Sequence, residues 1–348
     1  MPVKSFEAIN PATDITSTRT FLHEVIPITG SIVSGTYSDN NIKNYVHGMF
    51  QSVYDYPYLS SSANHIFDLS LGFDESSALS GSSNVTQTSK KINMYNQFAQ
   101  VLLGYTGSKN DVRMFESDLS LDMTGSMKEV FFINFSRLLT KDEIKKGSFR
   151  LSLSTAAWAN PNQGTLTLGD YVARVDGTGV ANAAGGDYAI LHTSSTANIG
   201  ELGHGVIFYQ SGIAVITSSV FAGVAQFNSA NGVNRTVNES LVSASITGSL
   251  DALRHRIQNI SFNNTTEINS TIYFCRAPAN KFNYSSNPTY TTGSKIRVKN
   301  IASDNPVSYI TTVGLYNAAN ELLAVAKLSE PLKKTVDTDL TIRVRLDY

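Results

Sequence analysis

One short loop carries the residue types of a magnesium site. Asp122, Thr124 and Ser126 fit the D-x-[ST]-x-S pattern, in which a carboxylate and two hydroxyls offer hard oxygens to Mg²⁺. Such a loop requires an apolar parallel strand before it and a long helix after it. Here the polar stretch 115–119 precedes the loop and a strand-like stretch, 130–135, follows it. We therefore expect no metal at this position, because a motif outside its structural context is a weak signal.

The histidines form no pattern typical of catalysis or zinc binding. His204 stands between two glycines with Glu201 nearby and could act as a base, but no G-x-S-x-G elbow supplies a nucleophile. A histidine in a hairpin turn is the favoured interpretation. The others lie far apart without H-x-x-x-H spacing: His23, His47, His65, His192 and His255. The sequence thus predicts no catalytic residue, no metal and no cofactor.

Other side chains suit binding rather than catalysis. Lys141, Lys145 and Lys146 lie close together, but two acidic residues stand among them, which indicates a solvated helix face and not a phosphate clamp. Two aromatic groups could stack on sugars or bases, or bury against a neighbouring subunit. They form the predicted interaction surface: Tyr54, Tyr56 and Tyr58, and Phe282, Tyr284 and Tyr290.

Charge and composition argue against nucleic-acid and membrane partners. The 348 residues carry a formal net charge of -1, and only 16% of them are charged, with no block of one sign. The most apolar stretch, 205–227, is interrupted by Gln, Ser and Thr, so two buried strands are favoured over a membrane helix. The first residues lack the layout of a secretory signal. We expect a polar, weakly charged, β-rich globular chain.

Apolar spacing predicts few helices. Residues 42–54 and 89–105 each show the i, i+3, i+4 spacing of one apolar helical face. Thr140 and Glu143 match a capping box, which predicts a short helix ending at Gly147. A brief helix is expected around 250–257. The polar, weakly periodic segments 76–89 and the first ~30 residues are candidates for arms that become ordered on assembly.

Short alternating runs predict strands along most of the chain. The last of them, 340–346, places Leu340, Ile342 and Val344 on one face and Thr341 and Arg343 on the other. The single cysteine, Cys275, is expected to be buried in a strand. Further strands are expected at 67–73, 130–135, 149–153, 165–168, 171–175, 188–192, 206–209, 213–217, 272–274, 295–299, 309–316 and 322–328.

These elements predict a mainly β fold with an α+β N-terminal part, antiparallel sandwich-like or barrel-like sheets and two to four short helices. We expect three parts along the chain. Residues 1–153 would form an α+β domain with two amphipathic helices, residues 154–248 a β-rich domain, and residues 249–348 a C-terminal antiparallel β region.

Several stretches resemble virion structural proteins of tailed bacteriophages of the marine and cyanobacterial type. They are FFINFSRLLTKDEIKKGSF at 131–149 and FNYSSNPT at 282–289. The stretches YITTVGLY at 309–316 and LLAVA at 322–326 are similar to the T-x-x-G-L-Y and L-x-A-V pattern of tail-fibre and baseplate proteins. The resemblance implies a place in the neck, tail or baseplate, and it carries over no catalytic residue.

The expected function is therefore structural, not enzymatic. The chain would assemble with copies of itself and with other virion proteins in the host cytoplasm and remain in the virion. A receptor-binding or carbohydrate-binding module of a tail fibre, acting on a host-surface glycan, is the alternative. A tail-associated depolymerase would need two carboxylates about 5 to 10 Å apart across a groove, and the sequence shows no such pair.

Overall fold

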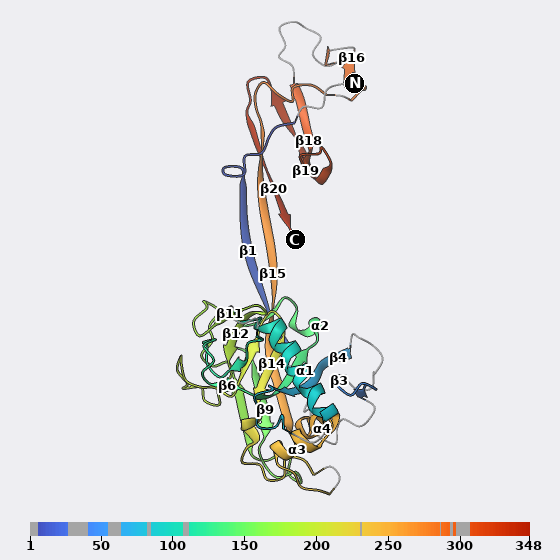
Figure 1. Ribbon diagram of the computed structural model, residues 1–348. Coiled ribbons are helices and arrows are strands. Elements are labelled where there is room, and N and C mark those ends of the chain that lie inside the picture. Colours follow the sequence, from blue (N-terminus) through green and yellow to red (C-terminus); the bar gives the residue numbers. More distant parts are fainter. Residues whose placement is uncertain are drawn as a thin grey trace. The chain divides into compact units, whose positions relative to one another are not determined.

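The computed structural model describes residues 6–26, 41–54, 64–81, 85–106, 111–229, 232–285, 287–292, 295–296 and 307–348. The described chain is 43% strand and 15% helix, with antiparallel sheets and four α-helices, so the predicted mainly β class with α+β character is confirmed. The chain divides into two compact units, unit 1 (Met1–Phe21 and Glu267–Tyr348) and unit 2 (Leu22–Thr266). Figure 1 shows both, and strands β1 (Ile15–Ile26) and β15 (Ile257–Ala277) have residues in each.

These units differ from the three parts expected from the sequence. The expected boundary after residue 153 falls inside strand β9 (Arg150–Ser154), and the one after residue 248 falls inside helix α4 (Ile246–Arg256). The N-terminal residues instead group with the C-terminal region, because β1 pairs with β15. Pairing between strands so far apart in sequence leaves no mark on local composition.

An eight-stranded sheet forms the centre of unit 2, with β7 (Glu129–Phe135) paired antiparallel to strands on both sides. Its burial follows from composition, because Val130 to Phe135 is almost wholly apolar and both faces of the sheet are covered. In spatial order the strands are β11 (Ala181–Ala183), β12 (Gly186–Ile190), β13 (Gly205–Phe208), β14 (Ile213–Thr217), β7, β4 (His65–Phe73), β3 (Phe50–Tyr54) and β2 (Ile42–Asn44).

One face of this sheet packs against a second sheet. Strands β8 (Glu143–Ile144), β9, β10 (Thr165–Gly169) and the unit 2 part of β15 form that second sheet. Side chains such as Phe135 and Phe262 meet between them, with ring centroids 5.1 Å apart. Helices α3 (Val237–Ser243) and α4 bury Leu241, Leu250 and Leu253 in the same core. This is the sandwich arrangement that alternating strands predict.

Helix α1 (Val85–Leu102) lies over the other face of the eight-stranded sheet. The ring of Phe98 stacks on Phe132 at 4.1 Å between centroids. The approach is close where the helix crosses β4, since a Cβ on Gly72 would lie 2.6 Å from the Lys91 carbonyl oxygen and from the Tyr95 nitrogen. The hairpin of β5 (Phe115–Glu116) and β6 (Ser126–Met127) completes this layer. The helix expected at 89–105 is thereby confirmed, with an earlier start.

The prediction of a helix at 42–54 is wrong. Residues 42–44 and 50–54 are strands β2 and β3, which pair antiparallel around a turn in which Gly48 has φ +65°. Pairing of β3 with β4 overrides the helical spacing. As a result Val46, which the helix would have buried, is fully exposed, whereas Gln51 and Ser52 are buried.

Two smaller expectations are also wrong. The stretch after Thr140 is not a helix: a single turn, α2 (Arg137–Thr140), precedes it, and Lys141 leaves the helix with φ +56° because residues 143–144 are drawn into the sheet beside β15. Residues 171–175 form turns instead of a strand.

The segment 76–89, which we expected to be an arm, is only partly described. Part of it belongs to α1, Ser77 is buried, and residues 82–84 lie outside the described residues.

Unit 1 has a smaller core. The unit 1 part of β15 pairs with β1 and, antiparallel, with β20 (Leu340–Asp347). Strands β18 (Val307–Tyr316) and β19 (Leu322–Thr335) form a hairpin whose inner face packs against Ile342 and Val344. The predicted alternation of residues 340–346 is confirmed, and Cys275 on β15 is partly buried beside this core. A short pair, β16 (Thr291–Thr292) and β17 (Lys295–Ile296), is also described.

Short helices are the rule in this fold. Besides the four α-helices there is a 3₁₀ turn, η2 (Ser218–Phe221), which follows β14 and is capped by the hydroxyl of Thr217. None of the helices in the described residues is long and apolar enough to cross a membrane.

Candidate functional site

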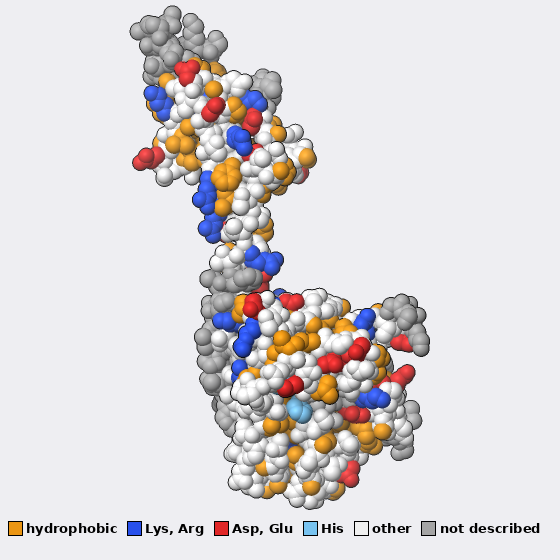
Figure 2. All heavy atoms as spheres, turned by 90° about the vertical axis from the view of Figure 1, so that its left-hand side faces the viewer, with side chains coloured by type: hydrophobic (Ala, Val, Ile, Leu, Met, Phe, Trp, Pro, Cys, Tyr) orange, Lys and Arg blue, Asp and Glu red, His pale blue; other side chains and the backbone are white. Residues whose placement is uncertain are grey.

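An exposed apolar surface lies on the β18–β19 hairpin of unit 1. Strand alternation buries Leu315 and leaves other apolar side chains outside. We call four of them, together with Phe6 of the N-terminal segment, the hairpin patch, with exposed fractions of 43%, 39%, 51%, 68% and 53%: Phe6, Tyr316, Leu322, Leu323 and Val325. Figure 2 shows hydrophobic side chains on the surface of this unit, with charged side chains of both signs between them. Several exposed apolar side chains on one hairpin are a feature of protein-binding surfaces.

The hairpin patch is held in a fixed arrangement. The ring of Phe6 meets Tyr316 edge to face, with centroids 5.0 Å apart. Gly314 makes room for these side chains, since a Cβ there would lie 3.0 Å from Tyr316 and 3.2 Å from Leu322. At the hairpin tip Asn317 and Glu321 bind each other through both side chain and backbone. The patch therefore offers a preformed surface to a partner.

A second candidate is a polar pocket of about 410 Å³ in unit 2. Lys145, Lys146 and Arg150 line one part of it. Residues Ser261, Phe262 and Asn263 of β15 line another, and Gly147 and Ser148 belong to the turn between them. The two lysines were expected on a solvated helix face. They lie instead in a turn, because β8 and β9 both pair with β15 and the chain between them loops out.

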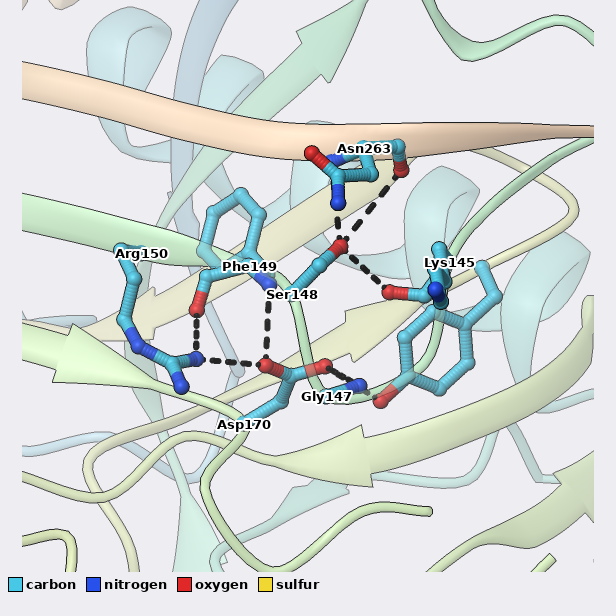
Figure 3. Close-up of polar contacts among 8 residues, drawn as sticks. Lys145, Gly147, Ser148, Phe149, Arg150, Asp170 and Asn263 are labelled. Carbon is cyan, nitrogen blue, oxygen red and sulfur yellow. Dashed lines mark hydrogen bonds and ion pairs between the residues drawn. The ribbon is translucent and has the colours of Figure 1, made fainter. Parts of the chain in front are cut away.

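A fully buried carboxylate holds this turn (Figure 3). Asp170 accepts hydrogen bonds from the backbone nitrogens of Gly147 and Phe149 at 2.7 and 3.0 Å. It also accepts one from the Tyr209 hydroxyl at 2.8 Å and forms an ion pair with Arg150 at 2.9 Å. Burial raises the pKa of Asp170 to about 6, because the four donors offset only part of the desolvation of its charge. Burial also raises the pKa of Tyr209, and the charge of Asp170 adds to this effect.

Further bonds fix the turn to β15. The Ser148 hydroxyl donates to the Lys145 carbonyl at 2.6 Å and accepts from the Asn263 nitrogen at 3.0 Å. The Lys145 nitrogen donates to the Asn263 carbonyl at 2.8 Å. Gly147 has φ +82°, and a Cβ there would lie 2.8 Å from a backbone oxygen, so the turn requires glycine. The pocket wall is consequently rigid.

The cations around the pocket differ in their partners. Lys146 pairs with Asp187 at 2.6 Å, and Arg150 pairs with Asp170 while its guanidinium stacks over Tyr171 at 4.0 Å. The side chains of Lys145, Ser261 and Asn263 make no hydrogen bond or ion pair within the described part of the chain. They keep their binding capacity for a ligand.

Four of the six aromatic residues predicted from the sequence are described, and their surroundings differ. Tyr54 is nearly buried in β3 of unit 2. Phe282 and Tyr284 are exposed in unit 1, whereas Tyr290 is half-buried and its hydroxyl donates to the Val307 carbonyl. Tyr56 and Tyr58 lie outside the described residues.

The apparent magnesium motif and the flanked histidine are accounted for locally. Asp122 accepts hydrogen bonds from the backbone and hydroxyl of Thr124, which also keep its pKa below the usual value. His204 joins β12 to β13, and its backbone nitrogen donates to the Leu191 carbonyl. Among the residues that the structure describes, no group of three His, Cys, Asp or Glu side chains could hold a metal ion.

Sequence reasoning missed Asp170 and the hairpin patch. Asp170 is a single acid after a short strand, and its partners lie some twenty to forty positions away, so no local pattern marks it. Alternation in 322–328 does signal a strand with an apolar outer side, and Leu323 and Val325 could have been recognised there. Comparison with known proteins adds nothing to this geometry: no family model, no curated protein and no solved structure matches the chain.

Proposed function

We propose that the chain is a structural component of a tailed-phage virion, in the tail, baseplate or neck, and that it acts by binding other protein chains. The observation that carries the binding role is the hairpin patch, a preformed apolar surface on a strand pair. The resemblance of residues 309–316 and 322–326 to tail-fibre and baseplate proteins supports the proposed place in a virion. The chain acts in this proposal as a building block and not as an enzyme.

The partner we propose for the hairpin patch is a second copy of the chain. A stable interface buries about 800 Å² on each partner, more than five side chains supply. The free edge of a strand can supply the rest by adding a neighbouring strand through backbone hydrogen bonds. In the described residues β20 pairs with β15 alone, so its other edge is open to such a contact. Low overall charge reduces the desolvation that assembly requires.

Mass photometry of the purified chain tests this role. We expect closed assemblies at integer multiples of 37.7 kDa. Leu323→Lys places a charge in the hairpin patch and should convert the assembly to monomer, because burying an unpaired ammonium in an apolar interface is costly. Leu202→Lys is the matched control: Leu202 is 65% exposed, close to the 68% of Leu323, but belongs to unit 2.

Two outcomes would contradict the proposal. If both variants keep the wild-type mass, the hairpin patch is not the interface. If antibody labelling finds the chain in the cytosol of infected cells and none on purified particles, it is not a virion component.

A further inference from the structure

The polar pocket of unit 2 has the composition of a ligand site. Its volume of about 410 Å³ lies within the range of small-molecule sites. Most such sites are apolar, whereas the residues that line this one include two lysines, an arginine, two serines and an asparagine. Its ligand must therefore be hydrophilic. This inference is independent of the assembly role, because the pocket and the hairpin patch belong to different units.

The charges of the pocket select the sign of the ligand. Asp170 is fully buried behind the turn and is already bound by four donors, and Asp187 is bound by Lys146 and by the Asn182 amide. Neither carboxylate is free to bind a cation. Lys145, by contrast, lines the pocket, and its ammonium has no partner in the described residues. The free binding capacity is thus that of an anion site.

The wall of the pocket formed by β15 favours a ligand that carries hydroxyl groups as well as a negative charge. Ser261 and Asn263 offer a hydroxyl and a carboxamide that are unused within the described residues, and both can donate and accept hydrogen bonds. They stand on β15, and the turn that faces them is held in place by Asp170 and Ser148. A rigid site loses little entropy when it binds.

We infer that this pocket binds a small acidic sugar, with the carboxylate at Lys145 and the sugar hydroxyls at Ser261 and Asn263. Lys146 and Arg150 remain bound to their own carboxylates, so Lys145 supplies the net positive charge of the site. The single carboxylate–lysine contact and the open polar wall correspond to binding in the millimolar range.

An NMR titration of the full chain tests the site, with the backbone amides of Gly147, Ser148 and Asn263 as reporters. The probe is sodium glucuronate, glucose is the neutral match and acetate is the anion without hydroxyls. We expect saturable shifts at these amides with glucuronate and much weaker binding of the other two. Lys145→Gln should weaken glucuronate binding about tenfold, the loss of one charge-assisted hydrogen bond. Lys128→Gln, a partly exposed lysine outside the pocket, should leave binding unchanged.

Asn263→Ala provides a second variant that leaves the charge intact and should weaken glucuronate but not acetate. The inference is overturned if glucuronate produces no saturable shift up to tens of millimolar, or if Lys145→Gln binds as well as wild type. Equal affinity for acetate and glucuronate would also overturn it, because the pocket would then recognise only the negative charge and not the sugar hydroxyls.

Discussion

Two buried cations of unit 2, Lys91 and Arg256, are bound by backbone carbonyl oxygens. Lys91 donates to the carbonyls of Leu241 and Ala244 at the end of α3, and its pKa is lowered by burial to about 8. Arg256 is fully buried and donates to four carbonyls, those of Ser154, Ala156, Gln226 and Phe227. Each of these hydrogen bonds pairs a buried side-chain donor with a backbone carbonyl, so both groups are satisfied. Each side chain therefore connects several segments of the chain.

Arg256→Leu should lower the free energy of unfolding by about 3 kcal/mol or more, because four buried carbonyls lose their donor and the cavity is only partly filled. Urea denaturation followed by circular dichroism measures the change. Arg174→Leu is the control, since Arg174 is exposed and should change stability by less than about 0.5 kcal/mol. Equal effects of the two substitutions would show that the buried guanidinium does not tie these loops together.

Lys91 gives the stability a defined pH dependence. Its folded pKa lies below its unfolded value of 10.5, so folding favours the neutral amine. Its contribution is fully present above pH 10.5 and is lost as the pH falls through about 8. Between pH 7.5 and 9.5 the wild type should therefore gain about 2 kcal/mol relative to Lys91→Met. Urea denaturation of both proteins across this range measures the difference, and parallel profiles would contradict it.

At the scale of elements, close packing of α1 on β4 depends on one glycine. Gly72→Ala should lower the free energy of unfolding by about 2 kcal/mol, because the added Cβ meets backbone atoms at 2.6 Å that cannot move without shifting the helix. Thermal unfolding measures the loss. Gly81→Ala is the matched control, since nothing lies within 4 Å of its Cβ position. A loss as large in the control would contradict this account, because a Cβ at position 81 meets no atom within 4 Å.

Two copies of the capping-box pattern show when local sequence predicts a helix correctly. Thr140 and Glu143 match the capping box but begin no helix, whereas Thr236 and Glu239 form a complete one at the start of α3. The difference lies in the residues after the cap. On α3, Val237 and Leu241 lie on one helical face and are buried, while residues 143–144 pair with β15. A cap pattern therefore predicts a helix only where an apolar face comes after it.

The strands were largely predictable and the sites were not. Alternation and apolar runs indicated β4, β7, β13, β14 and β20 because each strand carries its own burial pattern. The pocket depends on contacts between residues 145–150, Asp170 and 261–263. These contacts arise from the sheet order, which local sequence does not encode.

At the scale of the whole molecule, the two units differ in the size of their cores. The unit 1 cluster holds three buried apolar residues, whereas two large clusters fill unit 2. Because local stability follows the buried apolar surface, unit 1 should open at a lower free energy than unit 2. Hydrogen–deuterium exchange measured by mass spectrometry should show faster exchange in β18–β20 than in β7 and β14. Uniform protection would contradict this difference.

The same measurement reports on assembly. Raising the protein concentration should slow exchange in β18 and β19 of the wild type and leave β7 unchanged, because association protects the chain that it buries. Leu323→Lys should abolish the concentration dependence. If exchange in the hairpin does not depend on concentration although the mass shows an oligomer, the copies meet elsewhere.

The pairing of β1 with β15 has a consequence for synthesis on the ribosome. The Asp14 carboxylate binds Arg276, a residue 262 positions later, and the Asp14 carbonyl accepts a hydrogen bond from the Phe274 nitrogen. At about 5–20 residues per second, the first strand waits roughly 10–50 s after it emerges before its partner exists. During that time its edges can bind other nascent chains. The part of β1 that belongs to unit 1, ITSTRTF at 15–21, is mostly hydroxyl-bearing residues with one arginine, a composition that keeps this part of the strand hydrated and slow to aggregate while it waits.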